Sequence, residues 1–227
     1  MATRYWVGGT GTWDATTTTN WSATSGGIGG ASVPTSADAV VFDTLSNATA
    51  YTVTCTATQL RCASLTMAGP ATGNVTWAGT APLAIHGNVS LSATGITRTY
   101  TGAITLSSSS TGLTFTTNGN TLASTTTING VGCAWTLGSA LNIGTSSITV
   151  TNGSFDLASY NLTADNISSN SSNTRTIALG SGTITLSGSF LLGTSDSGSN
   201  TLTLTGGTSQ INFSSASPSL TGNGKTF

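Results

Sequence analysis

Short stretches in which apolar residues alternate with threonine constrain this chain most. Residues 51–56 read Tyr-Thr-Val-Thr-Cys-Thr, and the same period of two recurs at 103–106, 112–116, 147–151, 183–186 and 200–205. Side chains of a β-strand point alternately to opposite faces, so this pattern predicts strands with one buried and one exposed face. No segment shows a period of 3.6 residues, and we therefore predict an all-β protein with almost no helix.

The composition agrees with this prediction and excludes several classes of function. The 227 residues include 48 Thr, 33 Ser and 29 Gly, but only 5 basic and 6 acidic residues. Five cations do not make the basic surface that nucleic-acid binding requires, so we expect no nucleic-acid partner. The 37% of apolar residues and the many β-branched side chains argue against a disordered chain.

Five glycines mark a repeat of about 34 residues. Intervals of 32, 34, 35 and 36 residues separate Gly87, Gly119, Gly153, Gly188 and Gly224. A repeat of this length has room for about three strands and cannot bury its apolar face alone, whereas stacked repeats bury a continuous core. The sequence therefore predicts a parallel β-solenoid, as a right-handed β-helix, with apolar side chains inside and Thr and Ser outside.

An antiparallel β-sandwich is the alternative fold. Its strands also recur every ~8–12 residues, and it needs short hairpin turns. Asn118-Gly119, Asn129-Gly130 and Asn152-Gly153 have the sequence of such turns. The sandwich therefore stays open beside the solenoid at the level of the sequence.

Residues 1–45 differ in composition from residues 46–227, which hold the repeats. Three of the five Trp, namely Trp6, Trp13 and Trp21, lie in this first region. We expect it to cover the open first end of the solenoid, whose strand edges would otherwise pair with other chains. The same three rings are the candidate ligand-binding residues, because aromatic rings can also stack on sugars. Residues 221–227 resemble 116–122, so the repeats could continue beyond residue 227.

Targeting signals and cysteines give few further constraints. The apolar cluster Tyr5-Trp6-Val7 is followed at once by two glycines, unlike a secretory signal. No apolar run approaches the ~20 residues of a membrane span, and we expect no membrane insertion. The spacing of Cys55, Cys62 and Cys133 does not fit a zinc site. We favour three small buried thiols in a reducing compartment over a Cys55–Cys62 disulfide.

Residues capable of acid–base chemistry are few. His86 precedes a predicted corner and is interpreted as a turn residue. Asp156 and Asp165 could form the carboxylate pair of a glycosidase, but their separation along the sequence could place them on different faces. Arg98 and Arg175 occupy equivalent repeat positions and are interpreted as solvated strand residues. We predict no enzyme activity, no catalytic residue, no metal site and no cofactor.

Thr-x-Thr elements raise ice binding as a further hypothesis, because ranks of Thr on a flat solenoid face can match the ice lattice. Such a face needs a constant step between elements. The steps between these elements are far from constant along the sequence. We therefore regard ice binding as weakly supported.

The region between residues 4 and 43 carries a recognisable pattern, formed by Arg4–Asp14, Asn20-Trp21-Ser22, Val33-Pro34 and Asp38–Asp43. This pattern resembles the openings of phage tail-fibre and other virion appendage proteins with repetitive β-helical regions. It is also similar to the openings of β-helical adhesin and autotransporter passengers of bacteria. The resemblance implies a β-helical fibre or surface module, and it carries over no catalytic or receptor-binding residue.

From these observations we expect a non-enzymatic structural protein of a phage virion. It would be a tail fibre or a capsid or tail appendage that is assembled in the host cytoplasm and contributes to host-surface attachment. Its expected partners are other virion proteins, copies of itself (a homotrimer is one assembly open to a fibre) and cell-surface glycans. A bacterial cell-surface adhesin fragment and a polysaccharide-degrading tailspike domain are the alternatives.

Overall fold

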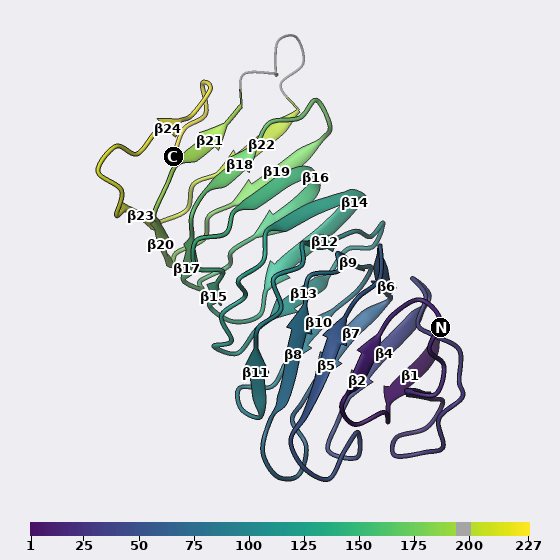
Figure 1. Ribbon diagram of the computed structural model, residues 1–227. Helices are drawn as coiled ribbons and strands as arrows, with labels where there is room; N and C mark the ends of the chain where they lie inside the picture. The colour runs from purple at the N-terminus through teal and green to yellow at the C-terminus, as the bar shows by residue number, and fades with distance from the viewer. Residues whose placement is uncertain (194–200) are drawn as a thin grey trace. The chain divides into compact units, whose positions relative to one another are not determined.

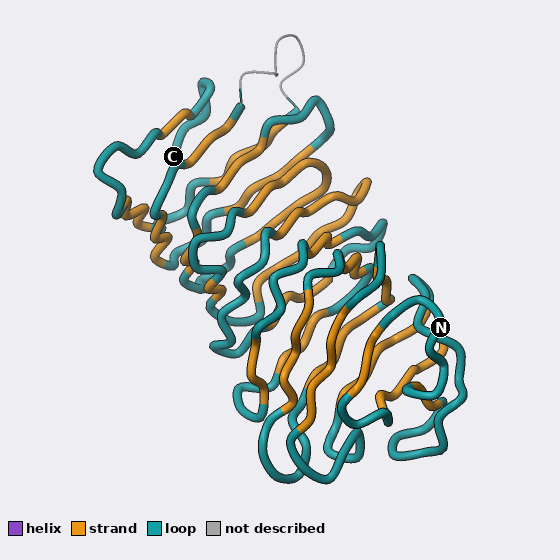
Figure 2. The backbone as a smooth tube through the Cα atoms, in the orientation of Figure 1, coloured by secondary structure: helices purple, strands orange, loops and turns teal. Residues whose placement is uncertain are grey.

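The computed structural model describes residues 1–193 and 201–227, and these form strands, turns and loops without a helix (Figure 2). The chain divides into two compact units, unit 1 (Met1–Ile104) and unit 2 (Thr105–Phe227). Strand β12 (Ile104–Leu106) spans the division. Each unit is a stack of parallel β-coils, and the described residues make about seven turns. The predicted parallel β-solenoid is therefore confirmed.

Unit 1 stacks its strands in three files, and Figure 1 labels these strands. One file has the order β10-β7-β4-β1-β3, a second has the order β11-β8-β5-β2, and a third pairs β6 with β9. The strands of unit 1 are β1 (Ala2–Trp6), β2 (Gly11–Trp13), β3 (Trp21–Ser22), β4 (Asp38–Phe42), β5 (Tyr51–Cys55), β6 (Leu60–Cys62), β7 (Ser64–Met67), β8 (Val75–Gly79), β9 (Leu83–Ile85), β10 (Val89–Leu91) and β11 (Ile96–Arg98).

Strand β5 shows how the alternating sequence produces the core. Tyr51, Val53 and Cys55 point inward and are buried, whereas the intervening threonines are half-buried on the outer face. Val53 pairs with Trp77 of the next coil in a parallel register. Because the register preserves the inside and outside of each strand, apolar side chains form continuous columns and hydroxyl groups form files on the surface.

An aromatic cluster lies in the first two coils of unit 1. The rings of Trp6, Trp13, Trp21 and Phe42 contact one another at centroid distances of 5.1–6.1 Å. Beside this cluster β3 runs antiparallel to β1, with Trp6 opposite Trp21, whereas the other pairings described within the units are parallel. This strand covers the edge of β1, as predicted for an N-terminal aromatic cap.

Unit 2 continues the same construction with two long strands. Its strands are β13 (Leu113–Thr116), β14 (Thr126–Leu137), β15 (Leu141–Asn142), β16 (Ile148–Asp156), β17 (Leu162–Ala164), β18 (Ile167–Ser169), β19 (Arg175–Ala178), β20 (Thr183–Leu186), β21 (Phe190–Leu192), β22 (Leu202–Thr205), β23 (Gln210–Phe213) and β24 (Leu220–Thr221). Strand β16 pairs with β14 on one side and with both β18 and β19 on the other. A separate file has the order β15-β17-β20-β23.

The number of residues in a coil differs from the predicted repeat length of about 34 residues. Ile148 pairs with Ile167 of the next coil, so this coil is much shorter than the spacing of the aligned glycines. Gly11 pairs with Val53, so the coil that contains the Gly-rich loop of residues 22–32 is longer than that spacing. The predicted repeat of about 34 residues was therefore wrong as the length of a coil, because loops of unequal length join the paired strands.

The Asn-Gly dipeptides explain why the sandwich alternative fails. Asn129-Gly130 lies inside β14 and Asn152-Gly153 lies inside β16. Asn118-Gly119 does form a turn, with φ of 47° and 86°, but Thr121, just beyond it, bridges in parallel to Asn142 of the next coil. None of the three dipeptides joins an antiparallel hairpin.

The predicted boundary at residue 45 does not coincide with the boundary between the units, because residues 1–45 and 46–104 both belong to unit 1. The division into a cap of residues 1–45 and a single repeat region of residues 46–227 stays a prediction.

Candidate functional site

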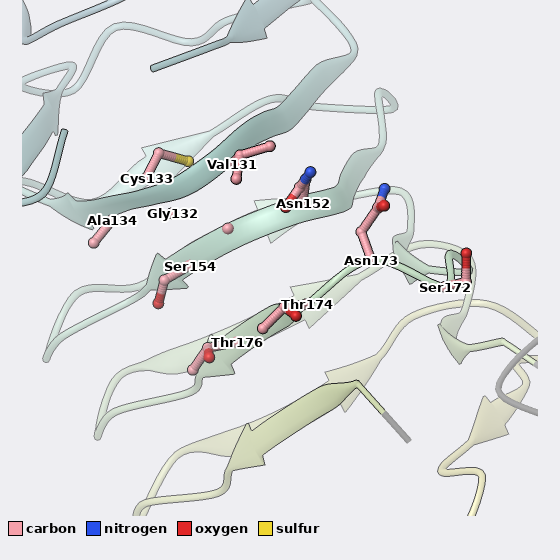
Figure 3. A pocket seen from close by; sticks show the side chains of 11 residues that line it. Val131, Gly132, Cys133, Ala134, Asn152, Ser154, Ser172, Asn173, Thr174 and Thr176 are labelled. Atoms are coloured by element: carbon pink, nitrogen blue, oxygen red, sulfur yellow. The ribbon is translucent and has the colours of Figure 1, made fainter. Parts of the chain in front are cut away.

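A groove of about 590 Å³ crosses three neighbouring strands of unit 2. We call it the unit 2 groove. Figure 3 shows its side chains on β14, β16 and β19 and on the loop before β19. The lining combines small residues with amide and hydroxyl groups, from Val131, Gly132, Cys133, Ala134, Asn152, Gly153, Ser154, Ser172, Asn173, Thr174 and Thr176.

Irregularities in the coils on either side of β16 form the unit 2 groove. In β14 the residues between Asn129 and Ala134 bulge, because these two residues pair with Asn152 and Ser154, only two positions apart. In the next coil but one, a loop at 170–174 separates β18 from β19, which both pair with β16. The bulge of β14 and the loop at 170–174 lie on either side of β16, and residues of both, with those of β16, line the unit 2 groove.

Gly153 is required at the centre of this arrangement. Its φ is 79°, in the left-handed region that favours glycine. A Cβ atom there would lie 2.4 Å from the Cys133 Sγ atom and 2.6 Å from the Gly130 carbonyl oxygen. The bulge of β14 can therefore approach β16 only because residue 153 has no side chain.

A buried arginine holds the loop that forms one wall of the unit 2 groove. The Arg175 side chain is 1% exposed. Its Nε donates to the Ser169 hydroxyl at 2.8 Å, and its Nη1 donates to the carbonyls of Ser171 and Asn173 and to the Thr201 hydroxyl. The guanidinium thus fixes the main chain on both sides of Ser172. The prediction of a solvated strand residue was wrong, because loop carbonyls supply the partners that water would otherwise supply.

The polar groups of the unit 2 groove are uncharged. Asn173 donates from Nδ2 to the Thr151 carbonyl at 3.0 Å, which orients its amide at the rim. Burial raises the pKa of the Cys133 thiol, against hydrogen bonds that include one from the Ser154 main chain. This thiol is therefore protonated at neutral pH and is a poor nucleophile. The groove is suited to hydrogen bonding with a neutral ligand.

The three tryptophans predicted as ligand candidates lie inside unit 1. Trp6, Trp13 and Trp21 are each at most 1% exposed. Their edge-to-face contacts with one another occupy the ring faces. The described geometry therefore offers a sugar no ring on which to stack, and the cluster acts in packing.

The residues considered for catalysis lie at separate corners. Asp156 ends β16 and accepts from the Ala158 main-chain N–H at 2.7 Å. Asp165 follows β17 and accepts from the Ser187 hydroxyl at 3.0 Å and from the Asn166 amide. His86 lies between β9 and β10, and its main-chain N–H donates to the Cys62 carbonyl of the neighbouring coil, which extends the pairing of β6 with β9. The two carboxylates act as local acceptors, and no interaction between them is described.

Arg98 of unit 1 is also more enclosed than the sequence predicts. Its guanidinium carbon lies 5.0 Å from the centroid of the Trp77 ring, and Tyr100 stacks on the same indole at 4.5 Å. Burial lowers the pKa of Arg98 to about 10. The side chain stays charged at neutral pH, and cation–π attraction compensates part of its desolvation. The prediction of a solvated side chain was wrong here too.

The cysteines are free and buried, as favoured from the sequence. Burial raises the pKa of Cys55 to about 12, against a hydrogen bond from the Trp77 indole N–H at 3.3 Å. Burial also raises the pKa of Cys62. These thiols therefore contribute to packing in the protonated form.

Some threonines that are unevenly spaced along the sequence lie in register on neighbouring strands. Thr52, Thr76 and Thr97 pair in register across β5, β8 and β11, although unequal lengths of chain separate them. Thr12 and Thr54 form a second pair beside them. Unequal separations between Thr-x-Thr elements along the sequence therefore do not exclude a regular row of threonines on the surface. Ice binding stays a hypothesis from the sequence.

The residues of the unit 2 groove were not predicted as a site from the sequence. Asn152-Gly153 carried a signal, but the dipeptide also has the sequence of a hairpin turn. Ser154 and Thr176 carried none, since Ser and Thr are frequent throughout the chain, with 33 Ser and 48 Thr. Only the three-dimensional register shows which of them lie together.

Within residues 1–193 and 201–227, no group of three or more His, Cys, Asp or Glu could hold a metal ion. Among the same residues, no helix has the length and apolar character needed to cross a membrane.

Comparison with known proteins gave no matching family model, curated protein or solved structure. The candidate site therefore depends on its geometry alone.

Proposed function

We propose that this chain is a non-enzymatic structural module of a phage virion appendage that contributes to attachment to the host surface. The observation that carries the proposal is the stacked construction of each unit. Apolar columns such as Ile148, Ile167 and Phe190 run through the interior in register, while hydroxyl files cover the outside. Such a stack supplies a rigid support whose surface stays soluble with few charges.

The chemistry of the few charged residues supports a structural role. Asp156 and Asp165 accept hydrogen bonds at their own corners, and Arg175 holds a loop. General acid–base catalysis needs such groups directed together at a substrate. An appendage instead needs a scaffold and contacts to other virion proteins or to further copies of the chain, and a homotrimer is one way in which a fibre assembles.

Mass spectrometry of purified particles tests the location of the chain. The organism that encodes it is induced to release phage, and particles are purified by density gradient. We expect the chain to band with the particles at a fixed ratio to the major capsid protein. Recovery only in the outer-membrane fraction of the uninfected cell would instead identify a bacterial adhesin and would reject the virion proposal.

An activity assay tests the non-enzymatic part of the proposal. The purified chain is incubated with capsular polysaccharide and lipopolysaccharide of the same host, and new reducing ends are measured. We expect release no faster than in buffer. Release by the wild-type chain that is lost in Asp156→Asn but kept in Asp43→Asn would show a polysaccharide-degrading domain.

A further inference from the structure

We propose that the unit 2 groove binds a neutral oligosaccharide, with the sugar chain running across β14, β16 and β19. This inference rests on the proposed role in host-surface attachment, and it assigns the ligand class and the residues that would contact it. The groove volume of about 590 Å³ lies in the usual range of ligand sites.

The lining matches the chemistry of sugars. Side-chain amides such as that of Asn152 both donate and accept hydrogen bonds, as do the hydroxyls of Ser154 and Thr176. A sugar presents the same mixture of donors and acceptors on its ring. The exposed Val131 side chain, at 76% exposure, offers methyl groups to the C–H face of a ring.

The charge of the lining selects among glycans. Each of the eleven residues that line the groove is uncharged. The buried guanidinium of Arg175 donates to the surrounding loop, so its hydrogen bonds are directed at protein acceptors. A carboxylated or sulfated glycan would leave water without gaining a charged partner, which disfavours its binding. We therefore infer a neutral ligand.

The register of the strands gives the direction of the bound chain. Ala134, Ser154 and Thr176 occupy equivalent positions on three neighbouring strands. Parallel strands are spaced by about 4.8 Å, which is close to the length of one pyranose residue in an extended glycan. A chain that crosses the strands would therefore meet an equivalent position at each successive sugar.

The groove is organised before any ligand arrives. Arg175 fixes the loop around Ser172, and the Asn173 amide is held by the Thr151 carbonyl. Gly153 allows the bulge of β14 to pack against β16. Binding to a site that is already ordered costs little conformational entropy, so weak individual hydrogen bonds can add up to measurable affinity.

Titration of the full chain with defined oligosaccharides tests the proposal. The neutral probes are linear hexasaccharides of glucose, mannose, galactose and N-acetylglucosamine, and the acidic probes are hexasaccharides of hyaluronate and alginate. Affinity is measured by calorimetry, and the affected residues are identified by ¹H–¹⁵N NMR. We expect at least one neutral probe to bind and to shift the amide signals of Ser154, Asn173 and Thr176.

Two matched variants locate the binding. Thr176→Tyr fills the unit 2 groove and should lower the affinity at least tenfold. Thr185→Tyr makes the same change at a half-buried outer position of β20, outside the groove, and should change the affinity less than twofold. Ser154→Ala removes one neutral hydrogen bond and should weaken binding about fivefold. If the Thr176→Tyr variant does not fold, this loss tests whether the ligand binds in the unit 2 groove.

Three results would overturn the inference: no binding of any neutral probe, tighter binding of an acidic probe, or equal losses in the groove and control variants. These results are separable from the proposed function. A chain found in particles that binds no neutral probe leaves the structural role intact and rejects the glycan site. A chain that binds a neutral probe but is absent from particles supports the glycan site and rejects the role in a virion.

Discussion

The first coil of unit 1 and the last coil of unit 2 bury their large side chains to very different degrees. In the first coil Trp6 and Trp21 are fully buried, whereas in the last coil Leu220 is 52% exposed and Phe227 is 44% exposed. The first coil carries β3, which pairs antiparallel with β1, and an aromatic cluster beside it. Strand β24 pairs with β21 in the same parallel sense as the coils before it. An antiparallel strand with large rings therefore covers an edge that parallel stacking alone leaves open.

The strongest test of this comparison removes one ring from each coil. Trp21→Ala should lower the free energy of unfolding by about 3–5 kcal/mol, because it leaves a large cavity in the aromatic cluster. Phe227→Ala should cost no more than about 1.5 kcal/mol, since its main described ring contact is with Phe190 at 5.4 Å. Urea denaturation of both variants measures the difference. Equal losses would show that the aromatic cluster does not stabilise the first coil more than ordinary packing does.

The second test compares two arginines, one in each unit. Arg175→Met should lower the free energy of unfolding by about 2–3 kcal/mol, because it removes the hydrogen bonds that the buried guanidinium donates to part-buried loop carbonyls. Arg61→Met should change it by less than about 0.5 kcal/mol, since this residue is exposed. Hydrogen exchange should also show faster exchange at residues 170–174 in the first variant. Unchanged exchange there would contradict the role of Arg175 in holding the loop.

The third test uses pH and concerns unit 1. Burial acts to raise the pKa of Asp38, but hydrogen bonds from Thr35 and the charge of Arg4 outweigh it and lower the pKa below 3.8. A carboxyl whose pKa is lower in the folded state stabilises the fold above its unfolded pKa, and this contribution is lost as pH falls through the folded pKa.

We therefore expect wild-type stability to fall below pH 4, as the lowered pKa of Asp38 is passed, and we expect Asp38→Asn to flatten this dependence. Thermal melts of both proteins between pH 2 and pH 7 measure it. Parallel curves for the two proteins would show that Asp38 makes no such contribution.

The smallest expected effect concerns the hydroxyl files. Thr76→Val in unit 1 and Thr163→Val in unit 2 replace half-buried outer residues with a side chain of similar shape and strand propensity. Each should change the free energy of unfolding by less than about 0.5 kcal/mol. Chemical denaturation is the measurement. A loss above about 1 kcal/mol in either variant would mean that hydroxyl files contribute to stability and not only to solubility.

The all-β class and the buried side chains of the strands could be predicted from the sequence. The alternation in 51–56 reports directly which side chains are buried, because a strand has a period of two. The sequence also predicts that Trp6, Trp13 and Trp21 cover one end, and their burial agrees with that. These features depend on residues that are close in sequence.

The coil length, the groove and the buried arginines could not be predicted in the same way. Loops of different length separate paired strands, so aligned glycines such as Gly153 and Gly188 are not neighbours in the stack: Gly153 lies opposite Arg175. The partners of Arg175 are loop carbonyls, which every residue possesses and which composition therefore cannot reveal. Such contacts follow from the register between coils, and the register is a long-range property.

The parallel stacking also determines how each unit bears force. Hydrogen bonds between coils point along the stacking direction, as between Phe155 and Ile177. Traction along that direction loads successive coils in series, so the weakest coil yields first and the others stay folded. Traction along the strands shears many bonds of one sheet together and meets higher resistance. A module of this kind would therefore lengthen coil by coil under axial tension, absorbing mechanical work without breaking a covalent bond.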